Sequence, residues 1–193
     1  MEGLDSGAIA KAKAILGAMV DQGRGVDAVL APMRVLAEEQ GWLWFGLASK
    51  QEFNQKCARL AASYAAHRHS EGRVVQLREG GFAFWVYRAD EDCGDDHSML
   101  DGLCLPPDHD FWQTAFPPLS LDCGCYVVGA RTDRSAERLG GNLSLRPPDP
   151  AIFGEDSDEP LTWRSRLRLS QDESLIALLK AVIELDTGAQ EKG

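Results

Sequence analysis

Two cysteines separated by a single glycine, Cys123 and Cys125, are well suited to binding a metal ion. In an extended segment, side chains two positions apart point to the same side, so both thiols would face one point. Further thiols and a histidine precede them, and together they predict a tetrahedral zinc site of three cysteines and one histidine. Zinc is the one cofactor that the sequence suggests, and the alternative is that the thiols pack as small buried apolar groups. The expected ligands are His97, Cys104, Cys123 and Cys125, with Cys93 as an alternative thiol.

The same part of the chain allows two other kinds of chemistry. A cysteine of this pair with His97 or His109 would form a thiolate–imidazole pair for covalent catalysis. Acidic neighbours raise the pKa of a thiol, which opposes that role, and no orienting third residue stands out. No catalytic residue is therefore assigned, and an enzyme is not expected. The acid–histidine patches 95–97 and 108–110 would suit either a hard cation or solvated turns.

The segment 97–125 that carries these residues is dense in turn-formers and aromatic side chains. This composition predicts a stiff, irregular loop rather than a long helix. Phe111 and Trp112 are expected to be largely buried, because side chains of this size are costly to leave in water. The residues expected to fix the loop or to contact a partner are Trp85, Tyr87, Asp101, Gly102, Phe111, Trp112, Pro117 and Pro118.

Flanking elements must position this loop. The aromatic and valine-rich segments 82–88 and 125–130 predict two strands that pair and bracket it. Apolar residues at helical spacing predict helices at 9–19, 26–37 and 50–70, the second ending at Gly41 and the third beginning at a Ser49 capping box. Residues 73–79 either continue the third helix or run extended. The aromatic residues at 42, 44 and 45 are expected in the core.

The last third of the chain changes character. Residues 132–162 are polar and rich in proline and glycine, which predicts a connector at the surface. Residues 163–169 alternate as a strand does. A capping box of Ser170 and Glu173 opens a final amphipathic helix that is expected to end at Gly188. One face of the alternating strand carries a basic stripe of Arg164, Arg166 and Arg168. The stripe would contact nucleic acid or an acidic partner, or it would be the solvent-exposed face of an edge strand.

Composition sets further limits. A formal charge of -10 over 193 residues argues against indiscriminate binding to nucleic-acid phosphates or to anionic membranes. No apolar run approaches the roughly 20 residues of a membrane helix. The N-terminus lacks the pattern of a secretory signal, so we expect the chain in the cytoplasm. In that compartment its five cysteines would be thiols or metal ligands rather than disulfides.

The order of motifs in the loop resembles that of the phage Mu F-like minor head proteins. That family has a His-x-x-(Leu)-x-Gly, then an Asp-x-Phe-Trp, a Pro-Pro and a terminal Cys-x-Cys. The chain departs from the family where Asp95 and Asp96 replace a basic residue, where Gly124 separates the cysteines, and where residues 119–121 replace Asn-Gly-Trp. The matching positions, which lie between about 15 and 130, are Gly41-Trp42, Ser63-Tyr64-Ala65, Trp85-Val86-Tyr87, Asp90 or Asp92, His97, Asp101-Gly102, Asp108, Asp110, Phe111-Trp112, Pro117-Pro118 and Cys123-x-Cys125.

This resemblance implies a structural function in virion assembly. The chain would be a minor head protein of a Mu-like phage, prophage or phage-derived particle, present in few copies near the portal. Its partners would be the portal, scaffold or major head protein, and it would pass from the host cytoplasm into the capsid. Two alternatives stay open: a metal-clipped Cys/His hydrolase or toxin-like enzyme, and an internal virion protein that binds DNA through the arginine stripe.

The expected fold is α+β. A helical N-terminal half packs on a small antiparallel sheet with a long ordered loop rich in proline and aromatic residues, and a strand and a helix follow at the C-terminus. The expected segments are a helical segment at 1–48, a Mu F-like core at 49–131, the connector at 132–162, and the C-terminal strand and helix at 163–193.

Overall fold

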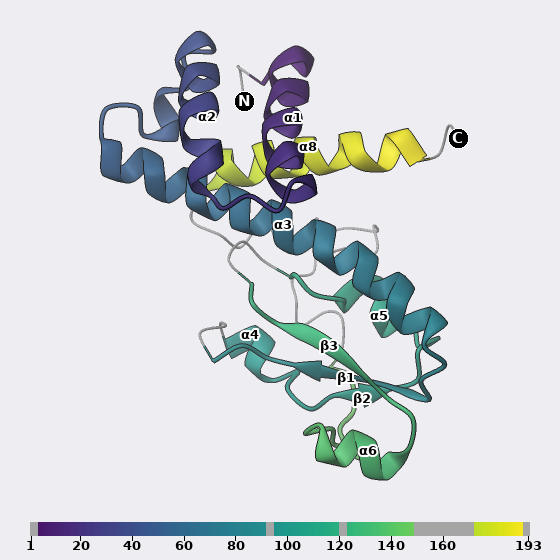
Figure 1. The fold of residues 1–193 in the computed structure, drawn as a ribbon. Helices are drawn as coiled ribbons and strands as arrows, with labels where there is room; N and C mark the ends of the chain where they lie inside the picture. Colours follow the sequence, from purple (N-terminus) through teal and green to yellow (C-terminus); the bar gives the residue numbers. More distant parts are fainter. Residues whose placement is uncertain (1–3, 92–94, 120–122, 149–171, 191–193) are drawn as a thin grey trace. The chain divides into compact units, whose positions relative to one another are not determined.

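The computed structural model describes residues 4–91, 95–119, 123–148 and 172–190. These residues combine helices with a three-stranded antiparallel sheet, which confirms the predicted α+β class (Figure 1). The chain divides into two compact units, Met1–Ala65 with Ser170–Gly193 and Ala66–Leu169. The division thus falls inside a long helix and not at the expected segment boundaries. Among the described residues, no helix has the length and apolarity that crossing a bilayer requires.

The first unit is helical. Its helix α1 packs against both α2 and α8, and the buried face of α1 includes Leu16 and Met19. Trp42 and Phe45 after α2 are buried as predicted, and the Phe45 ring lies 5.4 Å from that of Phe53. Trp44, which was also expected in the core, is only partly buried. The elements are α1 (Ser6–Asp21), α2 (Asp27–Glu39), the short 3-10 helix η1 (Leu43–Phe45), the first part of α3 (Lys50–Glu79) and α8 (Glu173–Gln190).

Helix α3 begins at the predicted cap and extends beyond the predicted range 50–70, to Glu79. The Ser49 hydroxyl accepts a hydrogen bond from the Glu52 amide at 3.3 Å. Beyond Gly72 the helix continues without a break to Glu79. Leu77 on this last stretch is fully buried in the core of the second unit. Burial of that apolar face favours the helical alternative for residues 73–79, because the packing outweighs the low helix propensity of a single glycine.

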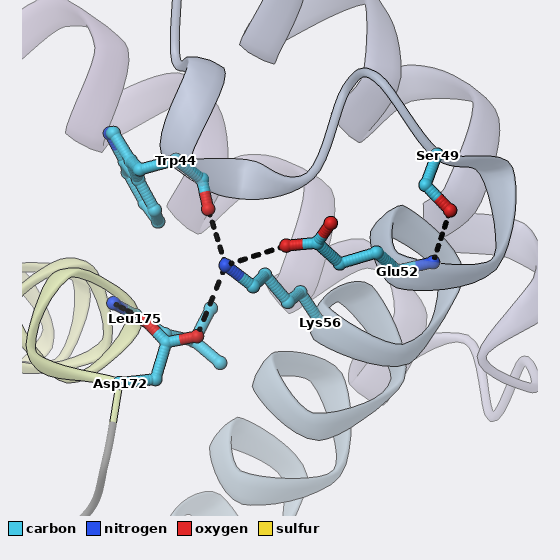
Figure 2. A network of polar contacts seen from close by, with 6 residues as sticks. All are labelled: Trp44, Ser49, Glu52, Lys56, Asp172 and Leu175. Atoms are coloured by element: carbon cyan, nitrogen blue, oxygen red, sulfur yellow. Dashed lines mark hydrogen bonds and ion pairs between the residues drawn. The ribbon is translucent and has the colours of Figure 1, made fainter.

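Lys56 joins three segments of the first unit (Figure 2). Its ammonium group donates to the Trp44 carbonyl in η1 and forms ion pairs at 3.4 Å with both Glu52 and Asp172. Asp172 also accepts a hydrogen bond from the Leu175 amide at 3.2 Å and so caps the first turn of α8. Only 16% of the Asp172 side chain is exposed, and Lys56 supplies a counter-charge to this carboxylate.

The second unit is built on the sheet, whose strand order is β2-β1-β3. The predicted strand pair is confirmed, because β1 (Phe84–Arg88) pairs with β3 (Tyr126–Ala130) in antiparallel register. A two-residue strand, β2 (Cys104–Leu105), pairs with the other edge of β1. One face of the sheet carries Trp85 and Tyr87 in the larger core with Leu77 of α3. The other face carries Val86 in a smaller core with Ala136 of α6 (Figure 1).

Short elements interrupt the loop and the segment after the sheet. The loop contains α4 (Asp95–Ser98), the short strand β2 and α5 (Phe111–Ala115), and the rest of its described residues follow the irregular path that was predicted. The prediction of a connector from residue 132 is wrong at its start, because Asp133–Arg138 forms helix α6. Thr132 and Ser135 cap this helix reciprocally, and the side chain of Ala136 within it is fully buried. The sequence prediction missed α6 because one buried alanine gives no apolar periodicity.

The C-terminal predictions are only partly covered. The strand at 163–169, its arginines and Ser170 lie outside the described residues. Helix α8 was predicted to end at Gly188 but continues to Gln190. A lone glycine costs only about 1 kcal/mol inside a helix and does not by itself end one.

We predict that Lys56→Met lowers the free energy of unfolding by about 1–2 kcal/mol, because it removes an ion pair with a largely buried carboxylate together with the contacts to Glu52 and the Trp44 carbonyl. The matched control is Lys11→Met, which breaks the exposed 3.0 Å ion pair with Glu39 and should cost no more than about 1 kcal/mol. Urea denaturation measures both values. Equal midpoints for the two variants would show that the Lys56 contacts are not structural.

Candidate metal centre

Three of the predicted zinc ligands lie together in the second unit. His97 Nδ1 is 3.6 Å from Cys123 Sγ and 3.7 Å from Cys125 Sγ. The three ligand atoms all lie within 4.8 Å of one another, and in the part of the chain that the structure describes they form the one group of this kind. The histidine comes from α4 and the two cysteines from the segment leading into β3.

Strand register explains why these residues meet. The pair Arg88–Tyr126 closes the β1–β3 ladder, so the residues just outside it, Ala89 on one side and Cys125 on the other, leave the sheet side by side. Cys125 is buried and belongs to the core formed by Trp85 and Tyr87. The chain after β1 returns to this end of the sheet through α4, which carries His97 to the two sulfurs.

The surroundings favour a thiolate at this point. The pKa of Cys125 is lowered, first by the hydrogen bond from the Cys123 thiol and, more weakly, by hydrogen bonds from His97, Tyr87 and the Asp90 backbone, while burial acts in the opposite direction. The pKa of Cys123 is raised, mainly because its thiol donates this same hydrogen bond to Cys125. Within the pair, the thiolate form is thus favoured at Cys125 rather than at Cys123, a pattern shared by metal ligands and activated thiols.

Gly124 has a steric function between the two cysteines. A Cβ atom at this position would come within 1.9 Å of Oδ2 of Asp90. The carboxylate therefore packs directly against the glycine backbone. A larger residue, such as the basic residue of the Mu F-like pattern, would displace the Asp90 side chain from the Gly124 backbone.

Cys104 does not join the group, and its expected role as a ligand is not what the structure shows. It pairs with Val86 across β1 and β2 and is buried in the smaller core with Ala130 and Ala136. Side chains of adjacent strand residues point to opposite faces, so Cys104 lies on the face of the sheet opposite Cys125. Cys93, the alternative thiol, lies outside the described residues.

A pocket of about 230 Å³ opens onto the two cysteines. The second half of α3 contributes His69, Ser70 and Arg73, and the proline pair and the start of β3 complete its lining. Arg73 donates from Nε and Nη2 to the Val127 carbonyl at 3.3 Å and thereby fixes the wall of the pocket. The sulfurs are thus accessible to a small ion from this side, although Cys125 itself is only 8% exposed.

Trp112 fixes the loop as predicted. Its ring centroid lies 5.6 Å from that of Trp85 and 6.3 Å from that of Phe116. Its indole N–H donates to the Pro106 carbonyl at 2.9 Å, so the side chain is both buried and hydrogen-bonded. Phe111 packs edge-on against Trp112 but is only partly buried, contrary to the expectation for this residue.

Asp101 and Gly102 tie the loop to the end of β1. Asp101 Oδ1 accepts hydrogen bonds at 2.9 Å from both Nε of Arg88 and the Ala89 amide. Gly102 has φ +78, and its amide donates to the Tyr87 carbonyl at 2.9 Å. A Cβ at this position would lie 2.7 Å from the Gly140 carbonyl oxygen, so both the conformation and the space require glycine.

The proline pair also has a structural function. Pro117 and Pro118 are joined by a cis peptide bond, and Pro117 is buried. The Ser70 hydroxyl on α3 donates to the Pro117 carbonyl at 2.5 Å. No sequence motif marks Ser70, Arg73 or Arg88 as structurally important, because a single polar residue on a helix or strand is not distinctive until its hydrogen-bond partner is known.

The acidic patches do not form a cation site among the described residues. Asp108, His109 and Asp110 are exposed and do not converge on one point. Instead, His109 Nδ1 accepts from the Phe111 amide at 3.1 Å, and Asp110 accepts from the Gln113 side chain at 3.2 Å. The solvated-turn interpretation therefore applies to residues 108–110.

We predict that Trp112→Ala lowers the free energy of unfolding by about 3–5 kcal/mol, because it empties a packed aromatic site and removes the hydrogen bond to Pro106. Met99→Ala, at a side chain that is 46% exposed in the same loop, should change it by less than about 1 kcal/mol. Chemical denaturation followed by tryptophan fluorescence and circular dichroism gives both values. An unchanged midpoint for Trp112→Ala would remove the residue from the core of the loop.

Thiol reactivity should differ sharply between the two units. Burial raises the pKa of Cys57 to about 12, so this thiol stays protonated and inaccessible in the folded protein. We expect iodoacetamide to modify Cys123 or Cys125 of metal-free protein first and Cys57 only on unfolding, with no acceleration at Cys57 between pH 7 and pH 9. Peptide mass spectrometry identifies the modified sites. Rapid native modification of Cys57 would contradict its placement in the core.

Comparisons with protein-family models, with curated proteins and with solved structures give no match for this chain. What the site does must therefore be inferred from its own geometry and from the order of its motifs.

Proposed function

We propose that this chain is a minor head (capsid) protein of a Mu-like phage, prophage or phage-derived particle, acting in head morphogenesis near the portal. One observation carries the proposal: the residues of the resemblance that form the sheet and anchor the loop make specific structural contacts within one compact unit, while its positions 41–42 and 63–65 lie in the other unit. Trp85, Tyr87, Trp112 and Cys125 share one core. Motif residues that share one core support the resemblance to the family more strongly than the same residues would if they were scattered over a surface.

The remaining motif residues fix the path of the chain around that core. Asp101 and Gly102 hold the loop against β1, and Pro117 is bound by Ser70 of α3. Each contact joins the loop to a different element of the unit. A loop held at several points is pre-organised, so little conformational entropy is lost when it docks on a partner.

The surface of this loop is the proposed docking surface. With its aromatic side chains turned inward, the loop exposes Pro106, Asp108, His109 and Asp110. The partner on this proposal is the portal, scaffold or major head protein. The chain would bind it in the host cytoplasm during assembly and remain in the capsid, and no membrane is involved.

One specific observation favours the runner-up function, a metal-clipped Cys/His hydrolase or toxin-like enzyme. Cys125 lies 3.7 Å from His97 and has a lowered pKa, as an activated nucleophile would. Yet His97 Nδ1 faces two sulfurs almost equally, and the sulfur with the lowered pKa is nearly buried. This arrangement suits shared ligation better than attack on a substrate. DNA binding through the arginine stripe is the third option, and those residues lie outside the described part of the chain.

The test is assembly with the head proteins encoded beside this chain. We expect the chain to co-sediment with procapsids and to be captured with the portal or another head protein. Asp108→Lys should reduce the incorporated amount several-fold, whereas Glu137→Lys, the same charge change on exposed α6, should not. Procapsids that form normally and never contain the chain would contradict the proposed function. Incorporation that neither variant alters would contradict the docking surface alone.

His97→Ala separates assembly from catalysis. In a head protein we expect this change to act through the order of the loop, with a graded loss of stability or incorporation. In a Cys/His enzyme it would abolish activity and leave fold and assembly intact. Particle yield, incorporation and infectivity are measured together. A variant that folds and enters particles normally but yields dead particles would favour the enzyme.

A further inference from the structure

We propose that His97 Nδ1, Cys123 Sγ and Cys125 Sγ together bind one zinc ion that clips α4 to the start of β3. The inference does not rest on the proposed function, because it concerns the chemistry of one side-chain cluster. It also revises the ligand set expected from the sequence: three residues instead of four, without Cys104.

The distances fit a tetrahedral ion. Zinc–sulfur bonds of about 2.3 Å and zinc–nitrogen bonds of about 2.0–2.1 Å, at a tetrahedral angle, hold nitrogen and sulfur roughly 3.5–3.6 Å apart. The two nitrogen–sulfur separations are 3.6 and 3.7 Å. A nitrogen that lies at this distance from two sulfurs at once is what a shared ion between them requires.

The donor set also selects the metal. Two thiols and one imidazole are soft and borderline ligands, which favour zinc over the hard cations magnesium and calcium. The Asp90 backbone donates to Cys125, as groups around metal-bound thiolates commonly do. In the described part of the chain the cluster supplies three protein ligands, and the pocket lined by both cysteines provides a path for the ion.

The position of the site explains what the ion would stabilise. His97 lies at the start of the loop and the two cysteines lie at its end, so a bound ion closes the loop at its base. The hydrogen bonds already described hold positions inside the loop, at Asp101, Trp112 and Pro117, and not its two ends. An ion that binds only the folded arrangement stabilises it by mass action, and its removal loosens this end of the sheet first.

The first experiment measures the metal content of the full chain purified from zinc-supplemented cells, by inductively coupled plasma mass spectrometry. We expect about one zinc per chain, and a loss of affinity of at least roughly tenfold in His97→Ala, Cys123→Ser and Cys125→Ser, because loss of an outer-shell partner alone costs about that much. Cys104→Ser is the matched control and should retain zinc. Loss of zinc from Cys104→Ser but not from Cys123→Ser would overturn the ligand assignment.

A second measurement uses the wild-type chain, so a variant that fails to fold cannot obscure the answer. The zinc is removed with a chelator and Co²⁺ is added. Ligation by two thiolates should give thiolate-to-cobalt charge-transfer absorption and the visible bands of a tetrahedral ion, and zinc should abolish both. Purified protein without zinc that also gives no such bands would overturn the proposal.

Discussion

The second unit depends on the central position of β1, which is hydrogen-bonded on both edges and buried on both faces. Because the side-chain period of a strand is two, this strand assigns Trp85 and Tyr87 to one core and Val86 to the other. A slip of one residue in its pairing with β3 would reverse both assignments. The register is therefore strongly specified, and the cysteine pair and its histidine are placed by it.

The loop between β1 and β3 shows how an irregular segment becomes ordered without long elements. Its polar contacts end on backbone groups of the sheet, as with Asp101 at the Ala89 amide and Gly102 at the Tyr87 carbonyl. Its apolar contacts converge on Trp85 through Trp112 and Phe116. Backbone groups that would otherwise be unsatisfied are thus paired, and the aromatic side chains supply the buried area that a loop of this length otherwise lacks.

The proposed head function and the proposed zinc site are compatible but separate. A docking surface needs a fixed backbone and exposed polar side chains, and the loop has both. A zinc clip at the base of the loop would add to that rigidity without taking part in the contact. The two thiols and the imidazole converge on one another, which suits ligation. The order of the motifs is why we favour a structural protein over an enzyme.

The sequence by itself determined most of the secondary structure and much of the site. Apolar periodicity located the N-terminal helices, the aromatic runs located the two main strands, and the Cys-x-Cys pattern located two of the three converging ligands. These signals are local, since they depend on repeats of two or 3.6 residues or on neighbours in the chain. Trp112 was likewise recognised, because its size alone makes exposure costly.

Only the tertiary structure decided which thiols meet. Cys104 stands in a two-residue strand, too short for alternation to reveal its face, and its pairing with Val86 turned it away from Cys125. Packing also carried α3 past Gly72, and reciprocal capping by Thr132 and Ser135 formed α6 in a segment without apolar periodicity. For Cys104 and α3, the deciding contact joins residues that are distant in sequence. For α6, the deciding contact is local but has no repeating apolar pattern. Neither kind of contact can be predicted from sequence periodicity.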